Sequence, residues 1–202
     1  MGDYAGRRRA AIEEAAFAVL LEKGYKAASI LEIARRAGAS NETLYKWYGN
    51  KQGLFAALVE ANARTVAELL RARLQGEAAD PIETLRDVGP LLLELVTSER
   101  AVALNRAAVG DVHDTATLGP ALARAGRETV VPLIASILEK ARRAGLIDHG
   151  DDEPVAETYI ALLIGDLQIR RATGVLAPLS EAEIAARAER ALTLLLSLYP
   201  PR

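Results

Sequence analysis

Apolar residues recur at helical spacing along almost the whole of this 202-residue chain. Alanine, leucine, glutamate and arginine dominate, and runs of β-branched residues are scarce, so helix is favoured over strand nearly throughout. The pattern predicts helices near residues 6–23, 30–37, 41–48, 51–75, 81–97, 101–111, 118–144, 154–172 and 181–198. We therefore expect an all-α fold of about nine helices.

Glycines and polar residues mark several of the predicted helix ends. Gly24 and Gly145 each follow a helical pattern and precede an apolar residue, which is typical of a C-terminal cap. Three helix starts have the pattern of a capping box, in which a polar side chain caps one backbone N–H and a glutamate three residues later reaches back. These predicted pairs are Ser29 with Glu32, Asp80 with Glu83, and Ser180 with Glu183.

Several classes of function are disfavoured by what the sequence lacks. It contains no cysteine, which excludes disulfides, thiolate zinc sites and cysteine nucleophiles. Its two histidines, His113 and His149, are too few and too far apart to suggest a metal cluster. We find no phosphate-binding glycine loop and no nucleophile elbow, and therefore expect no catalytic residues, no metal, no cofactor and no enzymatic activity. With no signal peptide or membrane span in the sequence, we expect a cytoplasmic protein with no membrane partner.

Charge is distributed unevenly along the chain. Residues 1–55 contain nine Lys or Arg against six Asp or Glu, although the formal net charge of the whole chain is −2. Because an acidic bulk disfavours non-specific adhesion to nucleic acid, any DNA contact is expected near the N-terminus. Arg7, Arg8 and Arg9 are there either as a minor-groove arm or as a disordered tail.

The segment from residue 29 to residue 48 is the most informative part of the sequence. Apolar residues at positions 30, 33, 34 and 37 form one face of a short helix. Gly38 then allows a sharp turn, and Ser40 can cap the next helix, in which Leu44 and Tyr48 share an inward face. Two short helices joined by such a turn have the geometry of a helix-turn-helix, whose second helix reads the major groove of DNA.

This segment resembles the DNA-binding domain of the TetR/AcrR family of bacterial repressors. The family pattern is a Thr or Ser cap, then Ile-Ala-x-x-Ala-Gly-Val-Ser, Thr-Leu-Tyr, a Tyr/His-Phe pair and a Lys. The matching elements are Ser29, Ile33 to Ser40, Thr43 to Tyr45, Trp47 with Tyr48, and Lys51. The likeness covers about the first 60 residues. It implies a DNA-binding domain over residues 1–54 and a ligand-binding and dimerisation domain over residues 55–202.

The resemblance also implies which residues contact DNA. Ser29, Tyr45 and Lys51 would contact phosphates, and the helix dipole beside the lysine favours this role. The remaining contacts would come from the second helix and its cap. The expected DNA-binding residues are Ser29, Ser40, Asn41, Glu42, Thr43, Tyr45, Lys46, Trp47 and Lys51.

Three observations leave alternatives open within this set. Tyr45 and Trp47 could instead be core residues of a helical hairpin. Glu42 would repel DNA unless it accepts a hydrogen bond from a cytosine amino group. Trp47 stands where the family has Tyr or His, and an indole offers a single N–H donor to a phosphate.

The last two predicted helices are apolar on more than one side. Such helices must be buried both against their own domain and against something else, and self-association is the simple answer. Dimerisation through a four-helix bundle is also what the resemblance implies, and the alternative is a monomer core that absorbs these residues. The expected interface residues are Tyr159, Leu163, Leu167, Leu192, Leu195 and Leu196.

Polar residues within otherwise apolar segments are candidates to bind a small-molecule effector, which we expect to be apolar. The resemblance places this ligand among residues 51–144 and the inner face of 154–172. A surface position or a structural salt bridge is an equally good explanation for each residue. The candidates are Asn62, Arg106, His113, Arg127 and Gln168, with Asp111, Tyr159 and Asp166 as further possibilities.

These expectations describe a repressor that binds palindromic operator DNA as a homodimer and is released by a small-molecule ligand. Glu42 and the overall acidity motivate an alternative, a helical small-molecule carrier or interaction protein whose hairpin has lost DNA binding. An enzyme is a distant third hypothesis.

Overall fold

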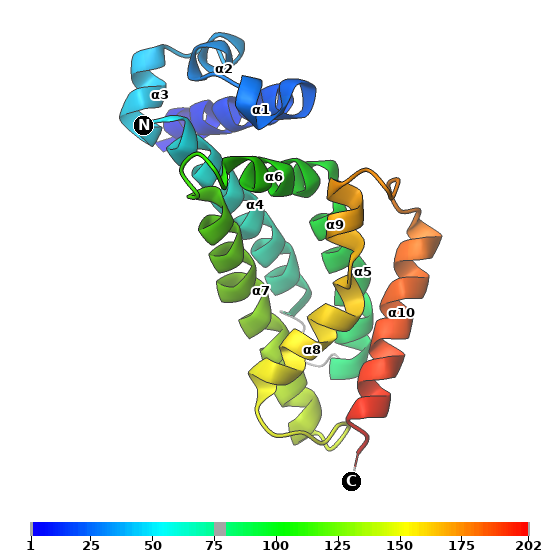
Figure 1. Ribbon diagram of the computed structural model, residues 1–202. Coiled ribbons are helices and arrows are strands. Elements are labelled where there is room, and N and C mark those ends of the chain that lie inside the picture. Colours follow the sequence, from blue (N-terminus) through cyan, green and yellow to red (C-terminus); the bar gives the residue numbers. More distant parts are fainter. Residues whose placement is uncertain (1, 75–79, 202) are drawn as a thin grey trace. The chain divides into compact units, whose positions relative to one another are not determined.

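The computed structural model describes residues 2–74 and 80–201, and within these ranges it contains ten α-helices and no strand (Figure 1). The all-α prediction is therefore confirmed, although the predicted helix end at residue 75 lies outside the described residues. The helices are α1 (Gly2–Ala27), α2 (Ile30–Arg36), α3 (Asn41–Tyr48), α4 (Lys51–Leu74), α5 (Pro81–Thr97), α6 (Glu99–Asp111), α7 (Leu118–Arg143), α8 (Asp152–Ile164), α9 (Leu167–Ala172) and α10 (Glu181–Leu198).

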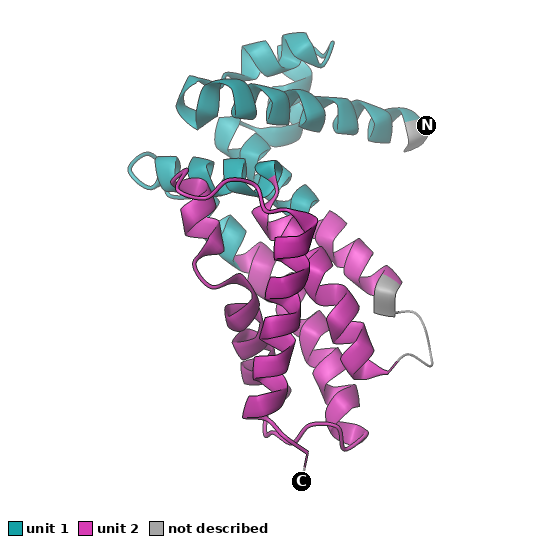
Figure 2. Cartoon of the chain, turned by 90° about the vertical axis from the view of Figure 1, so that its right-hand side faces the viewer, with its two compact units in different colours: residues 1–62, 99–123 teal, residues 63–98, 124–202 magenta. Residues whose placement is uncertain are grey.

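The chain divides into two compact units (Figure 2). Unit 1 comprises Met1–Asn62 and Glu99–Ala123, and unit 2 comprises Ala63–Ser98 and Arg124–Arg202. The N-terminal unit thus includes α6 in addition to the first helices of the chain. Helices α4 and α7 each contribute residues to both units.

Unit 1 is organised around α1, which packs against α2 and α6, while α2 packs against α3. Gly24, expected to end this helix, instead kinks it with a φ of 73° and a ψ of 170°, and α1 continues to Ala27. The core of this unit is formed by side chains that are fully buried or nearly so: Ile12, Phe17, Leu20, Ile33, Leu44, Leu54, Phe55, Leu58 and Leu104.

Unit 2 contains a bundle in which α5 packs against α8, α9 and α10, and α10 also packs against α8. One aromatic residue ties this bundle together, because Tyr159 is fully buried and its hydroxyl donates a hydrogen bond to the Leu85 carbonyl at 3.1 Å. The core consists mainly of branched aliphatic side chains: Leu85, Val88, Leu92, Leu93, Ile134, Leu138, Leu163, Leu192 and Leu195.

The helix predicted over residues 154–172 is two helices in the structure. Gly165 ends α8 with a φ of 50°, a conformation that glycine adopts without steric cost. From α10, the Arg187 Nε donates a hydrogen bond to the Leu163 carbonyl at 2.9 Å. This side chain satisfies a carbonyl at the end of α8, so the chain can start α9 in a new direction.

The three predicted capping boxes have different outcomes. At α10 the box forms completely, because the Ser180 hydroxyl accepts from the Glu183 N–H and the Glu183 carboxylate accepts from the Ser180 N–H. At α2 the serine caps, but the glutamate reaches basic side chains instead. At α5, Asp80 accepts from the Ile82 N–H, and Glu83 pairs with Arg86.

Candidate nucleic-acid interface

A helix-turn-helix forms at the predicted place, from α2 and α3. Gly38 turns the chain with a φ of 59°, and Ser40 then caps α3 by accepting a hydrogen bond from the Thr43 N–H at 3.1 Å. Leu44 is fully buried and anchors α3 to the rest of the unit. The second helix of the motif is therefore held by one cap and one apolar side chain, which leaves its other face for contacts elsewhere.

The exposed face of α3 carries residues 41, 42, 45 and 46. Because the spacings from 42 to 45, 41 to 45 and 42 to 46 are three or four residues, these positions lie on one side of the helix. Tyr45 has an exposed fraction of 55%, so the alternative that it is a hairpin core residue does not hold. Trp47 is only half-buried, and its ring stands edge-on to Tyr48 at 6.5 Å, so it takes part in packing.

The other expected DNA-binding residues are distributed around this face. Ser29 and Ser40 are exposed at the starts of α2 and α3, where each side chain caps its helix. Thr43 is half-buried, and its hydroxyl lies 2.9 Å from that of Ser40. Lys51 is half-buried at the first position of α4.

Arg7, Arg8 and Arg9 are helical residues of α1, and Arg8 and Arg9 contact the helix-turn-helix, so they are not a disordered tail. Arg8 donates a hydrogen bond to the Gly38 carbonyl at 2.9 Å and so holds the turn between α2 and α3. The Arg9 guanidinium lies 5.7 Å from the centroid of the Trp47 ring, within range of a cation–π contact. Sequence alone could not show these contacts, because the partners are more than 25 residues apart.

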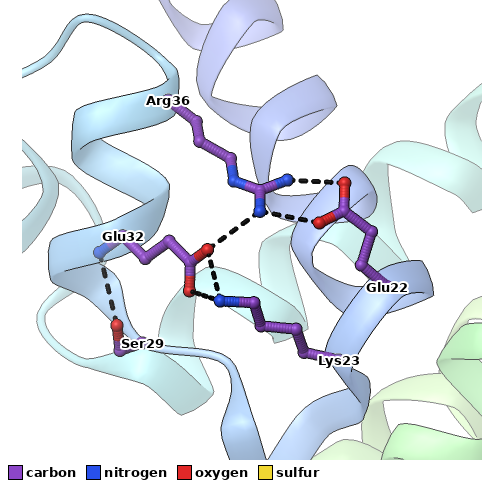
Figure 3. A network of polar contacts seen from close by, with 5 residues as sticks. All are labelled: Glu22, Lys23, Ser29, Glu32 and Arg36. Carbon is purple, nitrogen blue, oxygen red and sulfur yellow. Dashed lines mark hydrogen bonds and ion pairs between the residues drawn. The ribbon is translucent and has the colours of Figure 1, made fainter.

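A network of four charged side chains joins α1 to α2 (Figure 3). Arg36 makes a bidentate pair with Glu22, both N–O distances being 2.7 Å, and also contacts Glu32 at 2.9 Å. Lys23 donates to Glu32 from the other side at 2.8 Å. Hydrogen bonds from Lys23 and Arg36 hold the pKa of the Glu32 carboxyl below its ordinary value. The network fixes the first helix of the motif and explains why Glu32 does not complete a capping box.

Lys51 is held by contacts within unit 1. Its ammonium lies 4.4 Å from the centroid of the Tyr25 ring and donates a hydrogen bond to the Lys26 carbonyl at 3.2 Å. Burial lowers the pKa of this lysine, while the nearby carboxylates of Asp114 and Asp111 oppose that shift. The expected phosphate-binding lysine therefore has a fixed position on an aromatic ring.

The candidate effector-binding residues are divided between the two units. Asn62 in α4 is half-buried, Arg106 in α6 is exposed, and His113 is exposed in the turn after α6; all three belong to unit 1. In unit 2, Arg127 is exposed and pairs with Glu157 at 2.7 Å, and Gln168 donates to the Val96 carbonyl at 3.3 Å.

The three further candidates have structural partners of their own. Asp111 and Tyr159 are buried and hydrogen-bonded within the protein. Asp166 is exposed and lies 4.0 Å from Arg170 in the next turn of α9.

Unit 2 contains a groove of about 350 Å³ along α8. Of the predicted candidates, Gln168 lines this groove directly, and Arg127 reaches it through its ion pair with the lining residue Glu157. The other lining residues were not predicted from the sequence, because, apart from Glu157, they are ordinary apolar or small residues of helices. They are Val131, Ile160, Ala161, Ile164 and Gly165.

Most of the expected dimer-interface residues lie in the core of unit 2. Tyr159, Leu163, Leu167, Leu192 and Leu195 are buried there, and Leu196 is half-buried. Side chains without exposed surface cannot contact a second chain, so a dimer interface on these helices has to use their outward-facing neighbours. The exposed large hydrophobic residues from α9 onward are Ile169, Val175, Leu194 and Leu198.

Two family models match this chain. Residues 12–58 match the bacterial regulatory proteins of the TetR family, and residues 83–201 match the C-terminal domain of AefR-like transcriptional repressors. The chain belongs to the TetR family. It is thus a transcriptional regulator and not an enzyme, and the family that the motif indicated is confirmed.

Relatives of this TetR-family chain resemble it over most of its length. The HTH-type transcriptional regulator YvkB of Bacillus subtilis is 25% identical over 158 residues, which cover 76% of this chain and 78% of YvkB. A TetR-family regulator from Mesorhizobium loti superposes with a TM-score of 0.84 and 28% identity, covering 96% of this chain and 97% of that one. The flavonoid-responsive regulator FrrA superposes with a TM-score of 0.71 and 28% identity, covering 98% and 99%.

The structure also shows no helix, among the residues it describes, that is long and apolar enough to cross a membrane.

Proposed function

We propose that this regulator is a repressor that binds palindromic operator DNA as a homodimer and is released by a small apolar molecule. The observation that carries the proposal is the exposed polar face of α3, formed by residues 41, 42, 45 and 46 on a capped and anchored helix. A helix presented in this way offers amide, carboxylate, phenol and ammonium groups to the base edges and phosphates of a major groove.

In this proposal, Asn41 and Tyr45 on α3 make different kinds of contact with DNA. Asn41, at the start of the helix, reads a base edge, and an amide suits adenine in the major groove. Tyr45 contacts the phosphate backbone, which carries no sequence information by itself. Glu42 is compatible with this arrangement where its carboxylate accepts from a cytosine amino group.

The experiment is to select a duplex from a random pool with the wild-type protein and then measure affinities for it and for its single-base variants. We expect Tyr45→Ala to weaken binding to all of these duplexes alike. Asn41→Ala should instead relax the preference at one position by roughly tenfold, as expected for the loss of a bidentate base contact. Glu94→Ala, on the exposed side of α5, is the control and should leave every affinity unchanged.

Two results would contradict the proposal. One is wild-type binding no tighter than the ~10⁻⁴–10⁻⁶ M that is typical of non-specific association. That result would favour the carrier or interaction protein. The other is an equal loss of affinity for every duplex in both variants. That result would show that Asn41 and Tyr45 do not differ as base and phosphate contacts.

For the effector, we propose the groove along α8. The lining includes the apolar side chains of Val131, Ile160 and Ile164, and Glu157 and Gln168 add polar atoms. A volume of about 350 Å³ lies at the small end of the range of ligand sites. FrrA, a solved relative, is flavonoid-responsive. A planar aromatic molecule with a few hydroxyl groups fits this combination of apolar and polar lining side chains.

This part of the proposal has its own test. The flavone apigenin should dissociate the wild-type protein from its selected duplex, and Ile160→Trp, which fills the groove, should prevent the dissociation while leaving DNA affinity intact. If apigenin dissociated the wild-type and Ile160→Trp proteins from DNA at the same concentration, the groove along α8 would not be the effector site.

A further inference from the structure

Three helix ends of unit 1 meet at one buried carboxylate. Asp111 is the last residue of α6, has no exposed surface and accepts hydrogen bonds from the last turn of α1 and the first turn of α7. A carboxylate has only acceptor sites and can take several donors at once, which no neutral side chain of this size can do. The donors are the hydroxyls of Tyr25 at 3.1 Å, Thr115 at 2.8 Å and Thr117 at 3.3 Å, and the backbone N–H groups of Thr117 at 2.8 Å and Leu118 at 3.2 Å.

The charge on Asp111 is stabilised in place. Burial alone would raise the pKa of this carboxyl, but the hydrogen bonds from Thr115, from the backbone of Leu118 and Thr117, and from Tyr25 together hold it below its ordinary value. A buried charge with this many donors is a firm attachment point, because moving a donor away removes a hydrogen bond that solvent does not reach to replace.

Tyr25 connects Asp111 to α4. Its ring meets the Phe55 ring edge-on at 5.1 Å, and its hydroxyl is bound to Asp111, so both ends of the side chain are fixed. Lys51, the first residue of α4, lies with its ammonium 4.4 Å from the centroid of the same ring. The Lys26 carbonyl takes one of the three N–H donors of this ammonium, and an operator phosphate can take another.

We propose that Asp111 is a positioning residue for DNA binding: through the Tyr25 hydroxyl it fixes the ring on which the Lys51 ammonium rests, and so aims this lysine at an operator phosphate. The inference rests on the proposed function and adds a connection to it. The first backbone N–H of α7, that of Leu118, is bound to the same carboxylate. A displacement at the start of α7 would therefore move Asp111, then the Tyr25 ring, and then the Lys51 ammonium that contacts the phosphate.

A double-mutant cycle on DNA affinity tests this role. The probe is the duplex selected by the wild-type protein. The single variants are Lys51→Met, Tyr25→Phe, Asp111→Asn and Asp111→Glu, and Lys51→Met is also combined with each of the other three. Tyr45→Phe is made alone and in the Tyr25→Phe and Asp111→Asn backgrounds. Tyr25→Phe keeps the ring and removes only the hydroxyl, so the fold is retained, and thermal unfolding followed by circular dichroism verifies this. Tyr45→Phe serves as the matched control, because it removes a hydroxyl from a different expected phosphate contact.

We expect Lys51→Met to weaken binding roughly tenfold or more in the wild-type background, as for a charge-assisted hydrogen bond. In the Tyr25→Phe and Asp111→Asn backgrounds this loss should shrink by about threefold or more, which is the signature of coupled residues. The loss caused by Tyr45→Phe should be the same in all backgrounds. Asp111→Glu, which keeps the charge, should recover part of the Lys51 effect.

The contrary result is additivity. If Lys51→Met costs the same factor in every background, Asp111 supports only the stability of unit 1 and the inference is wrong. This outcome differs from a failure of the proposed function, in which the wild-type protein itself shows no specific binding and no cycle can be constructed.

Discussion

A β-carbon at Gly89 would lie 2.6 Å from the Tyr159 hydroxyl and 3.3 Å from the β-carbon of Ala188. The tyrosine cannot swing away, because it is fully buried and its hydroxyl is bound to the Leu85 carbonyl. We therefore expect Gly89→Ala to lower the free energy of unfolding by about 1–3 kcal/mol, although alanine is the better helix former. Urea denaturation measures this value.

The control for Gly89→Ala uses two further proteins, Tyr159→Phe alone and Tyr159→Phe combined with Gly89→Ala, both of which lack the obstructing hydroxyl oxygen. Tyr159→Phe alone loses a buried hydrogen bond. In the Tyr159→Phe background, however, Gly89→Ala should lower the free energy of unfolding by less than it does in the wild-type background. A Gly89→Ala protein as stable as the wild type would show that α5 and α8 can move apart at this point.

Single residues also mark where sequence reasoning stops in the candidate site. Lys51 could be assigned to DNA from the order and spacing of the motif, and its position at the start of α4 agrees with that assignment. Asp111 could only be named as a polar residue in an apolar segment, because Tyr25, which explains it, is 86 residues away. A sequence pattern indicates how residues are spaced along the chain, whereas the contact between Tyr25 and Asp111 depends on which helix ends meet in the fold.

Among the elements, the start of α10 offers the clearest test of local structure. Ser180 and Glu183 cap each other there, and the backbone and side-chain hydrogen bonds from Ser180 lower the pKa of the Glu183 carboxyl. We expect Ser180→Ala to destabilise unit 2 by about 1 kcal/mol, because it orphans a backbone N–H at the helix start.

At the other end of the same helix, Ser197 provides the matched control. Its hydroxyl donates back to the Thr193 carbonyl and caps nothing, so Ser197→Ala should change the stability by less than about 0.5 kcal/mol. Equal effects of the two substitutions in thermal unfolding would show that the capping box adds nothing to α10.

Helix existence was predictable for this chain, and helix ends were predictable only where the cause is local. The box at Ser180 and the cap at Gly145 follow from neighbouring residues, and both were expected. The break at Gly165 was not, because the donor that satisfies the end of α8 is Arg187 on another helix. Glu32 likewise leaves its own helix start for Lys23 and Arg36, a choice that depends on tertiary contacts.

For the whole molecule, the proposed homodimer predicts an effect of charge on the exposed apolar residues of α10. Leu194 and Leu198 are four residues apart and lie on one face, with exposed fractions of 39% and 57%. We expect Leu194→Glu with Leu198→Glu to weaken dimerisation by roughly tenfold or more, because two charges would be buried without partners. Sedimentation velocity over a range of concentrations measures the shift.

Leu21→Glu is the control for this dimer, since Leu21 is an equally exposed leucine in α1 of unit 1. It should leave the dimer intact. A wild-type protein that sediments as a monomer at micromolar concentration would remove the dimer from the proposal, and with it the palindromic operator, since two half-sites require two recognition helices.

Arg8 holds the turn before α3 through a main-chain oxygen, the carbonyl of Gly38. Together with the Ser40 cap and the burial of Leu44, this keeps the helix in place by means that do not involve its exposed side chains. Positions 41, 42, 45 and 46 can therefore accumulate substitutions at little cost to folding. After a gene duplication, one copy of such a regulator can acquire a new operator through these surface positions, while the inherited scaffold stays unchanged.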